Sequence, residues 1–387
     1  MSRRISVAFA NMVYPGWLAG GQYLYNLLFA IKTSEMDMEL VLRIFPGTPK
    51  ENYKMLNGLF DRVLEAPLPY WVERLPKTLK KNLPFARYFE ERKLRQGGID
   101  AQFLFTDLGY ARSIPSVLWL PDFQHVHFPN FFTEDDLKYR THSYPLAARE
   151  SNLVILSSQH ALTDLKHIAP DVIGKARVLN FVAQVPLNVY QADSEAIARL
   201  YHLPDKFFFL PNQFWQHKNH EAVIKALALA KLESPELTVV CSGGVYDYRK
   251  PEYFDAILQQ IAIHGLGENI RILGGIPREH FWQLMRRAVA VIQPSLFEGW
   301  STSVEEVKSL GKSIIVSDIP VHREQDPASA IYFDPHNPVE LAQNLLKIQK
   351  EKTPGPELKL EQTAREQLRG RTRAFAQTFY EIINEIT

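Results

Sequence analysis

The sequence predicts an α/β protein built from two domains, each with a parallel sheet. Short apolar runs rich in β-branched residues alternate along the chain with segments whose apolar residues recur at helical spacing. The length of 387 residues is enough for two domains of ordinary size. Hydrophobic periodicity fades between Val178 and Leu203, so we place the domain boundary near residue 187. The first domain is expected to span residues 1–187 and the second residues 188–370.

The composition is that of a globular chain with nearly balanced charge. Hydrophobic residues make up 46% of it, and 44 basic residues stand against 43 acidic ones. Such a balance gives no electrostatic footprint for nucleic acid. No apolar stretch approaches the length of a membrane span, and the apolar part of the N-terminal segment is too short for a signal peptide. We therefore expect a cytoplasmic protein, with peripheral contact to the inner face of a membrane left open.

Cys241 is the single cysteine of the chain. A lone cysteine excludes an internal disulfide and a cysteine-based zinc cluster. Because it lies in the apolar run 237–241, we expect a buried structural thiol.

The chain opens with a predicted strand, a glycine-containing loop and a helix. Residues 5–10 form an apolar run, and leucine and isoleucine recur at helical spacing over residues 24–31. Gly20 and Gly21 lie in the expected loop between them. This order is typical of a nucleotide-binding α/β unit, but two glycines alone are equally consistent with an ordinary turn.

A basic and aromatic segment follows at residues 71–95. Eight lysine and arginine residues stand there against three glutamates, with tryptophan, leucine and phenylalanine interleaved. One interpretation is a solvated helix face. The other is an interfacial patch that docks on anionic lipid near a lipid-linked acceptor. The sequence leaves both interpretations open.

Polar side chains follow the strand predicted at residues 116–120. Asp122, His125 and His127 come soon after it. Because α/β folds bind ligands beyond the carboxyl ends of their strands, these residues are candidate ligand contacts. Two histidines and a carboxylate are also, in principle, able to bind a metal ion.

The second domain is expected to begin with a strand at residues 207–210, followed by P-N-Q-F-W-Q-H-K-N-H. Lys218 stands in this segment, just before a helix predicted at residues 221–231. A cation at a helix N-terminus is unfavourable without an anion nearby, so Lys218 is a candidate anion contact. The alternative is an ordinary surface lysine at a helix start. We expect Asn219 to cap this helix.

The most informative stretch runs from Val289 to Asp318 and parses as strand, loop, helix and strand. Residues 289–292 are an apolar, mostly β-branched run, which is typical of a buried parallel strand. The spacing Ser303-x-x-Glu306 predicts a capping box at the start of the helix. Gly311 is expected to end that helix as its C′ glycine.

Two carboxylates flank the start of this helix. Glu298 and Glu306 are eight residues apart, so the loop can fold Glu298 back over the first turn. The free N–H groups of that turn are electropositive and suit a phosphate. A phosphate repels a carboxylate, so the two acids are better suited to accept hydrogen bonds from neutral hydroxyls. The site therefore predicts a ligand that carries both phosphates and hydroxyls, such as a nucleotide sugar. The alternative is that Glu306 is only a helix cap.

The segment P-S-L-F-E-G-W-S-T-S-V-E-E, followed by G-K-S-I-I-V-S-D-I-P, resembles the donor-site signature of family-4 retaining glycosyltransferases, also called glycosyl transferases group 1. The resemblance implies the GT-B fold, with two Rossmann-like domains whose parallel sheets face a central cleft. It implies that Glu306 binds the ribose hydroxyls and that Glu298 contacts the transferred sugar. It further implies that the donor diphosphate is held, chiefly by backbone amides, at Gly299, Trp300, Ser301, Thr302 and Ser303.

Other family positions can be matched with less support. Lys218 matches a phosphate-binding lysine, whereas Gln213 stands where the family usually has an arginine. Gly20 and Gly21 match the loop beneath the diphosphate. Ile276 lies in the turn that offers backbone groups to the base. The variant P-N-Q-F-W-x-H-K-N-H is similar to a subgroup found among bacterial polysaccharide-building transferases.

The first domain departs from the family at one further position. Asp122 matches the acid of a family His-Asp pair, but Pro121 stands where the histidine would be. We therefore favour His125 as a sugar or acceptor contact; the alternative is a loop histidine bonded to backbone. In the family a C-terminal helix crosses back to the first domain, and residues 371–387 suit that role.

The resemblance implies a retaining glycosyltransferase that moves a sugar from a nucleotide diphosphate sugar to a saccharide or lipid-linked saccharide. The residues expected to carry the reaction are Glu298, Lys218 and His125, with no metal and no other cofactor. Two alternatives stay open, a sugar-nucleotide epimerase of the same fold and a non-catalytic nucleotide-sugar-binding partner of another transferase.

Overall fold

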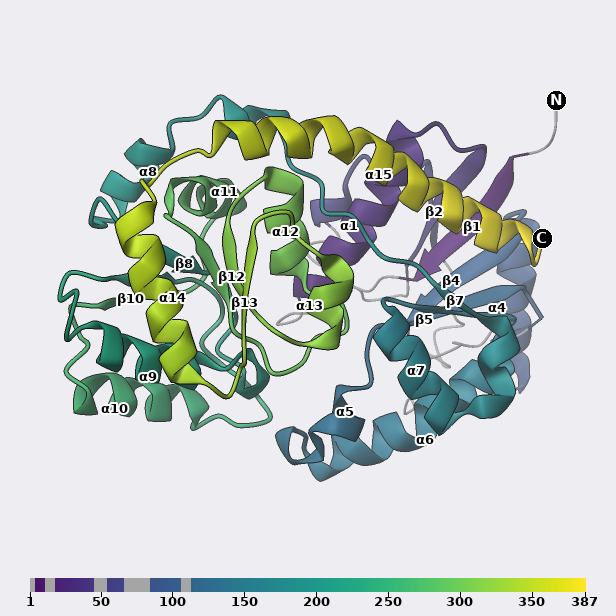
Figure 1. The fold of residues 1–387 in the computed structure, drawn as a ribbon. Coiled ribbons are helices and arrows are strands. Elements are labelled where there is room, and N and C mark those ends of the chain that lie inside the picture. Colours follow the sequence, from purple (N-terminus) through teal and green to yellow (C-terminus); the bar gives the residue numbers. More distant parts are fainter. Residues whose placement is uncertain (1–3, 11–17, 45–53, 66–83, 106–112) are drawn as a thin grey trace. The chain divides into compact units, whose positions relative to one another are not determined.

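The computed structural model describes residues 4–10, 18–44, 54–65, 84–105 and 113–387. Within it the chain divides into two compact units (Figure 1). Unit 1 comprises Met1–His127, Glu134–Val182 and Gly370–Thr387, and unit 2 comprises Phe128–Thr133 and Ala183–Arg369. Most of the basic segment 71–95, including Trp71 to residue 83, lies outside the described residues.

Unit 1 is organised on a seven-stranded parallel sheet with the strand order β3-β2-β1-β4-β5-β6-β7. Its strands are β1 (Ile5–Ala10), β2 (Met38–Ile44), β3 (Arg62–Glu65), β4 (Ala101–Phe105), β5 (Ser116–Leu120), β6 (Leu153–Leu156) and β7 (Ala176–Val178). Its helices in the described ranges are α1 (Leu18–Thr33), α4 (Pro84–Gln96), α5 (Gln124–His127), α6 (Glu134–Glu150), α7 (Gln159–Ile168) and the 3-10 turn η3 (Pro170–Lys175).

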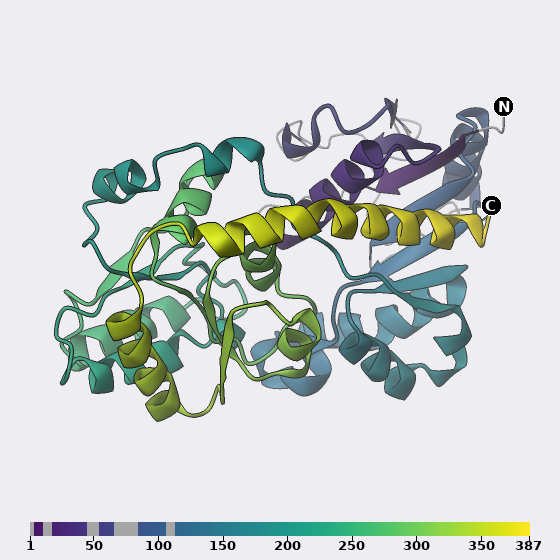
Figure 2. The ribbon, with the colours of Figure 1, turned by 45° about the horizontal axis from the view of Figure 1, so that its top comes forward.

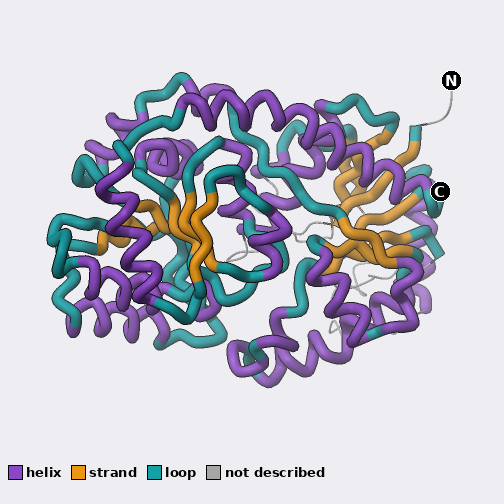
Figure 3. The backbone as a smooth tube through the Cα atoms, in the orientation of Figure 1, coloured by secondary structure: helices purple, strands orange, loops and turns teal. Residues whose placement is uncertain are grey.

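Unit 2 is organised on a six-stranded parallel sheet with the order β10-β9-β8-β11-β12-β13. Its strands are β8 (Phe208–Leu210), β9 (Val239–Cys241), β10 (Ile270–Ile272), β11 (Val291–Gln293), β12 (Ile314–Ser317) and β13 (Ala330–Phe333). Its helices are α8 (Ser194–Leu200), α9 (His220–Ala230), α10 (Tyr253–Ile263), α11 (Arg278–Arg287), α12 (Thr302–Leu310), α13 (Pro320–Gln325) and α14 (Pro338–Glu351), with the 3-10 turns η2 (Pro129–Phe131), η4 (Leu187–Tyr190) and η5 (Gln216–Lys218). Figure 3 shows these strands side by side with helices around them.

The sheet of unit 2 is buried on both faces, because its strands carry apolar side chains on each side. Phe208 and Leu210 pack into one apolar cluster with residues of α9, α10 and α14. Phe207 and Phe209 point the other way, into a second cluster with residues of α11 and α12. Successive side chains of a strand alternate between faces, so a continuous apolar run fills two cores at once. Cys241 belongs to the first cluster; it is buried as expected, and burial raises its pKa to about 12.

The strand order of unit 2 reverses between β8 and β11. From β8 the chain proceeds to β9 and β10 on one side, and from β11 to β12 and β13 on the other. Loops leaving the carboxyl ends of two such strands diverge and leave a crevice, which is where open α/β sheets bind ligands. The segments after Leu210 and after Gln293 are therefore placed to form a site. The equivalent segments of unit 1, which follow β1 and β4, lie outside the described residues.

The last helix, α15 (Leu358–Asn384), belongs to both units (Figure 2). Residues up to Arg369 belong to unit 2, and residues from Gly370 onward belong to unit 1. In unit 1 the ring of Phe379 lies 5.9 Å from that of Phe9 and 5.5 Å from that of Phe103. The buried apolar side chains of this last segment are thus part of the unit 1 core. Among the described residues, no helix combines the length and apolar character needed to cross a membrane.

Candidate functional site

The loops after β8 and β11 are joined by a partly buried ion pair. The Lys218 Nζ lies 2.7 Å from the Glu298 Oε1, and the two side chains are 17% and 8% exposed. The segments are also tied by backbone, because the Leu296 N–H donates to the His217 carbonyl at 2.8 Å. The chain therefore brings together a cation and a carboxylate at the switch point, although they are 80 residues apart in sequence.

Gln293, the last residue of β11, connects this pair to the start of α12. Its Nε2 donates to the Glu298 Oε1 at 3.1 Å and to the Ser301 Oγ at 2.7 Å. Its Oε1 accepts a hydrogen bond from the Asn212 side chain, which follows β8. Sequence patterns alone did not single out Gln293 and Asn212. The available signal was a polar residue at the carboxyl end of an otherwise apolar strand, and each of the two is fully or almost fully buried.

The start of α12 differs from the predicted capping box. The helix begins at Thr302, and its N-cap is Ser301, whose Oγ accepts from the Val304 N–H. The predicted cap, Ser303, instead donates its hydroxyl to the Pro211 carbonyl at 3.2 Å, and this contact holds the loop after β8. Glu306 is therefore no part of a cap. The expected end of the helix is confirmed, since Gly311 adopts a left-handed φ of 85°.

Glu306 is a buried carboxylate with a cationic partner. It is 2% exposed and forms an ion pair with the Arg278 guanidinium. Burial raises the pKa of Glu306, and the charge of Arg278 opposes that effect. Arg278 is the first residue of α11, two residues after the predicted base contact Ile276, and its guanidinium lies over the Phe281 ring. Arg278 could not be found from the sequence, because nothing local marks it as the partner of a residue on α12.

The start of α9 also departs from the expectation. Asn219 occupies the N-cap position with a left-handed φ of 56°, but its side chain makes no capping bond. Its Nδ2 instead donates to the Pro294 carbonyl at 3.0 Å and to the Pro335 carbonyl at 2.9 Å. Asn219 therefore fastens α9 to the loops after β11 and β13. The N-cap residue of α9, next to Lys218, therefore provides no side-chain cap for the first N–H groups of the helix.

The remaining predicted residues of unit 2 lie along the same edge of its sheet. Gln213 is half-buried directly after Asn212, and Gly299 and Trp300 are half-buried in the loop before α12. The Ser301 N–H donates to the Gln325 Oε1 at 3.2 Å, so this amide is already committed within the protein. Thr302 and Ser303 supply the next N–H groups at the start of α12.

The predicted residues of unit 1 take different positions from those expected. Gly20 and Gly21 lie in the first turns of α1, because that helix begins at Leu18, and both are buried. Their placement in a loop was wrong, and the loop itself, residues 11–17, lies outside the described residues.

Asp122 and His125 are both engaged within unit 1. The Asp122 Oδ1 accepts from the Gln124 N–H at 3.0 Å and from Arg140 at 3.1 Å, so it caps α5 and forms an ion pair. His125 is 4% exposed and lies edge-on to the Tyr144 ring, and burial lowers its pKa to about 4. It is a neutral imidazole near pH 7. The roles of both residues toward a sugar stay predictions.

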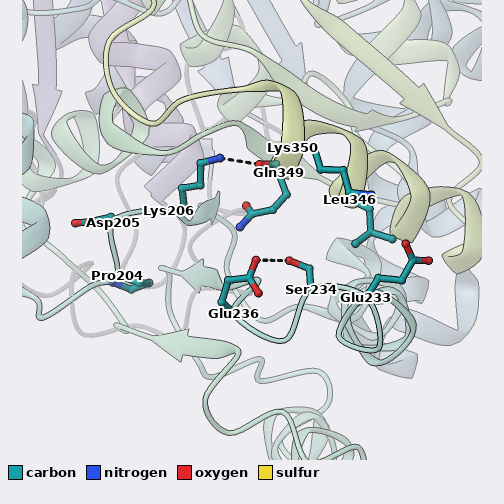
Figure 4. A pocket seen from close by; sticks show the side chains of 9 residues that line it. All are labelled: Pro204, Asp205, Lys206, Glu233, Ser234, Glu236, Leu346, Gln349 and Lys350. Atoms are coloured by element: carbon teal, nitrogen blue, oxygen red, sulfur yellow. Dashed lines mark hydrogen bonds between the residues drawn. The ribbon is translucent and has the colours of Figure 1, made fainter.

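A surface hollow of unit 2 lies elsewhere (Figure 4). Lys206 lines it and donates to the Gln349 carbonyl, and Ser234 donates to Glu236. Lys206 precedes β8 and Glu236 precedes β9, so the hollow lies at the amino ends of these strands. Ligands of such sheets bind at the carboxyl ends. We therefore assign the site to the network around Glu298 and Glu306.

The comparison with protein families agrees with the fold and with this network of side chains. Residues 195–367 match the family model "Glycosyl transferases group 1", which covers most of unit 2. Unit 2 is thus a group 1 glycosyltransferase domain, and the two parallel-sheet units are those of the GT-B fold, as the sequence predicted.

Individual relatives agree with this assignment. Over 157 residues the chain is 26% identical to the O-antigen chain mannosyltransferase RfbU of Salmonella typhimurium; the match covers 38% of this chain and 42% of that relative. The chain therefore spans less than half the length of this curated relative.

Solved structures extend the likeness of fold to the whole chain. Anabaena Alr3699/HepE, in complex with UDP and glucose, has a TM-score of 0.69 at 17% identity, covering 98% of this chain and all of that one. The sucrose-phosphate synthase of Thermosynechococcus elongatus has a TM-score of 0.67 at 16% identity, covering 99% of each chain.

Proposed function

We propose that the chain is a retaining glycosyltransferase that moves a sugar from a nucleotide diphosphate sugar to a saccharide or lipid-linked saccharide. The observation that carries this proposal is the Lys218–Glu298 ion pair at the switch point of a group 1 domain, with the buried Glu306–Arg278 pair on the helix that follows Glu298. The likeness to an O-antigen chain mannosyltransferase supports a role in polysaccharide or glycoconjugate biosynthesis. The solved complex of Alr3699/HepE with UDP and glucose supports a nucleotide sugar as the donor.

Donor binding would exchange the partners of Lys218. In the free site its ammonium is neutralised by Glu298. A diphosphate carries more negative charge and would take the Lys218 contact, together with the first N–H groups of α9 and α12. Glu298 would then be released to accept hydrogen bonds from hydroxyls of the transferred sugar. Glu306, fixed by Arg278, would accept from the ribose hydroxyls.

The chemistry proposed is displacement on one face of the sugar. The bond from the anomeric carbon to the diphosphate oxygen breaks, and a bond to the acceptor oxygen forms on the same side. The acceptor proton passes to the departing diphosphate. Lys218 and the two helix starts stabilise the charge that develops on the leaving group, and the buried carboxylates orient the sugar. None of these steps calls for a metal ion at the donor site.

We also propose that the protein works in the cytoplasm, where nucleotide sugars are made available to such transferases. Contact with the inner face of a membrane would use the basic segment 71–95, whose charge suits anionic lipid.

Product analysis tests the proposed activity. Purified protein is incubated with UDP-, GDP-, ADP- and dTDP-sugars, first without and then with a saccharide acceptor, and products are followed by NMR. We expect transfer only with acceptor, with the anomeric configuration of the donor retained. Lys218→Ala should abolish transfer, whereas Lys225→Ala, an exposed lysine of α9, should not. Isomerised donor without acceptor would identify an epimerase instead, and an inverted product would contradict the retaining mechanism.

A further inference from the structure

A second cluster of polar side chains lies at the carboxyl edge of the unit 1 sheet, and the donor site does not use it. His127 is the last residue of α5, which follows β5. His160 and Asp164 lie on α7, which follows β6, and their spacing of four residues places them on one face of that helix. Since β5 and β6 are neighbouring parallel strands, their carboxyl ends bring these three side chains together.

The three side chains converge closely. The His127 Nε2 lies 2.9 Å from the Asp164 Oδ1, and the rings of His127 and His160 have centroids 5.2 Å apart. One ligand atom of each residue lies within 4.8 Å of those of the other two. A tetrahedral ion with bonds of about 2.0–2.1 Å holds its ligand atoms about 3.3 Å apart. Small side-chain rotations therefore suffice to bring all three atoms onto one ion.

Asp164 has unused capacity to bind a cation. Its side chain is 9% exposed, and the Oδ1 is occupied by His127. The Oδ2 is buried and has no hydrogen-bond partner in the part of the chain that the structure describes. A buried carboxylate oxygen without a partner is costly, and such a group calls for an explanation. A simple His127–Asp164 ion pair leaves this oxygen unused, whereas a bound cation would satisfy it.

We propose that His127, His160 and Asp164 form a binding site for one divalent cation of the Zn²⁺ class. Two imidazoles and one carboxylate suit Zn²⁺, Co²⁺ or Ni²⁺, while Ca²⁺ and Mg²⁺ prefer sites made of oxygen ligands. Three protein ligands leave a fourth position open to water or to an oxygen of a ligand. The bound ion would link α5 to α7 at the ligand-binding edge of unit 1.

The proposed site differs from the three residues Asp122, His125 and His127 that the sequence offered as metal ligands. Asp122 is occupied by the Gln124 N–H and by Arg140, and His125 is packed against Tyr144. Of that trio only His127 joins the cluster, and its partners come from α7. No metal was expected from the sequence, so the proposed site departs from that expectation; it lies in unit 1 and is independent of the proposed transfer reaction.

Metal titration of the full chain tests the inference. Protein stripped with a chelator is titrated with ZnCl₂ by calorimetry, and with CoCl₂ while the visible absorption of cobalt is recorded. We expect one ion per chain, a cobalt spectrum typical of four ligands, and no competition from Mg²⁺ or Ca²⁺. Zinc should also raise the melting temperature, because a ligand bound only to the folded state stabilises it.

Two variants and one control decide the outcome. His160→Ala and Asp164→Asn should each weaken zinc binding at least tenfold and remove the thermal shift. His167→Ala should change neither, because His167 is exposed on the same helix and bonds the Thr163 carbonyl. Circular dichroism melts without metal establish that the variants fold. Absence of zinc binding by the native chain, or zinc binding unchanged in both variants, would overturn the proposal.

Discussion

Lys218 and Glu298 are each other's charge partner, so neither can be removed without consequence for the other. Loss of one partner leaves a partly buried charge uncompensated. We expect Lys218→Met and Glu298→Gln each to lower the free energy of unfolding by about 1–3 kcal/mol, and the double variant to lose less than the sum. Urea unfolding of all four proteins measures the coupling energy. Lys225→Met is the control, with an expected change below about 0.5 kcal/mol. Strict additivity would show that the pair does not interact.

Two buried histidines of unit 2 should make stability depend on pH. Burial lowers the pKa of His220 to about 3, helped by Lys218, and that of His322 to about 4. The unfolded chain binds protons at these groups near pH 6.5. Stability is therefore complete above pH 6.5 and falls as the pH drops toward 4, by about 1.4 kcal/mol per pH unit for each histidine.

The His220→Phe variant isolates one of these contributions. Phenylalanine keeps a ring against Phe214, which stacks on His220 at 4.1 Å, but binds no proton. Urea unfolding at pH 7.5, 6 and 5 gives the free energy of unfolding at each pH. This free energy should fall less steeply with decreasing pH in the variant, by a slope that corresponds to about one proton fewer taken up on unfolding. Parallel declines for the two proteins would contradict this assignment.

At the residue scale, the sequence predicts which side chains are candidates for the site better than it predicts which residues those side chains contact. Spacing and charge near a helix start single out Glu298, Glu306 and Lys218 as candidates, and their roles toward a donor stay predictions. Local rules did not separate Ser301 from Ser303 as the cap, because the choice depends on the contact between the Ser303 hydroxyl and the Pro211 carbonyl. Contacts of this kind join residues distant in sequence, which no local pattern encodes.

At the scale of elements, the end of α12 is fixed by Gly311. Its φ of 85° lies in the left-handed region, and a Cβ there would overlap the Leu360 carbonyl group of α15. We expect Gly311→Ala to lower the free energy of unfolding by about 2 kcal/mol or more, because strain and overlap add. The matched change is Gly370→Ala, inside α15, where a Cβ meets nothing within 4 Å. It should stabilise by about 0.5–1 kcal/mol. Equal effects in thermal unfolding would contradict this account.

The elements themselves follow from the sequence to different degrees. The strand predicted at residues 116–120 coincides with β5, because Pro115 and Pro121 mark its two ends. The strand predicted at residues 289–292 is observed as β11 at Val291–Gln293, since the polar Gln293 still pairs in the ladder. The last helix begins at Leu358, earlier than expected, because its first turns are charged and carry a weak apolar stripe.

At the scale of the whole molecule, the alternation of strands and helices predicts the two parallel sheets, because it leaves few topologies. It does not predict which loops meet. That follows from the strand order, which places β8 beside β11 and β5 beside β6. The first adjacency brings together residues of the proposed donor site, and the second brings together the His127, His160 and Asp164 cluster.

The central claim is that unit 2 binds a nucleotide diphosphate sugar at the switch point through Glu306. Calorimetric titration with UDP, GDP, ADP and dTDP and their sugars, on native protein and on Glu306→Gln, tests it most directly. Glu279→Gln, an exposed neighbour of Arg278, is the control. We expect the nucleotide and nucleotide sugar of one base to bind the native protein. This binding should be lost in Glu306→Gln and retained in Glu279→Gln. If no nucleotide binds, or if binding is the same in all three proteins, the donor site assigned here is wrong.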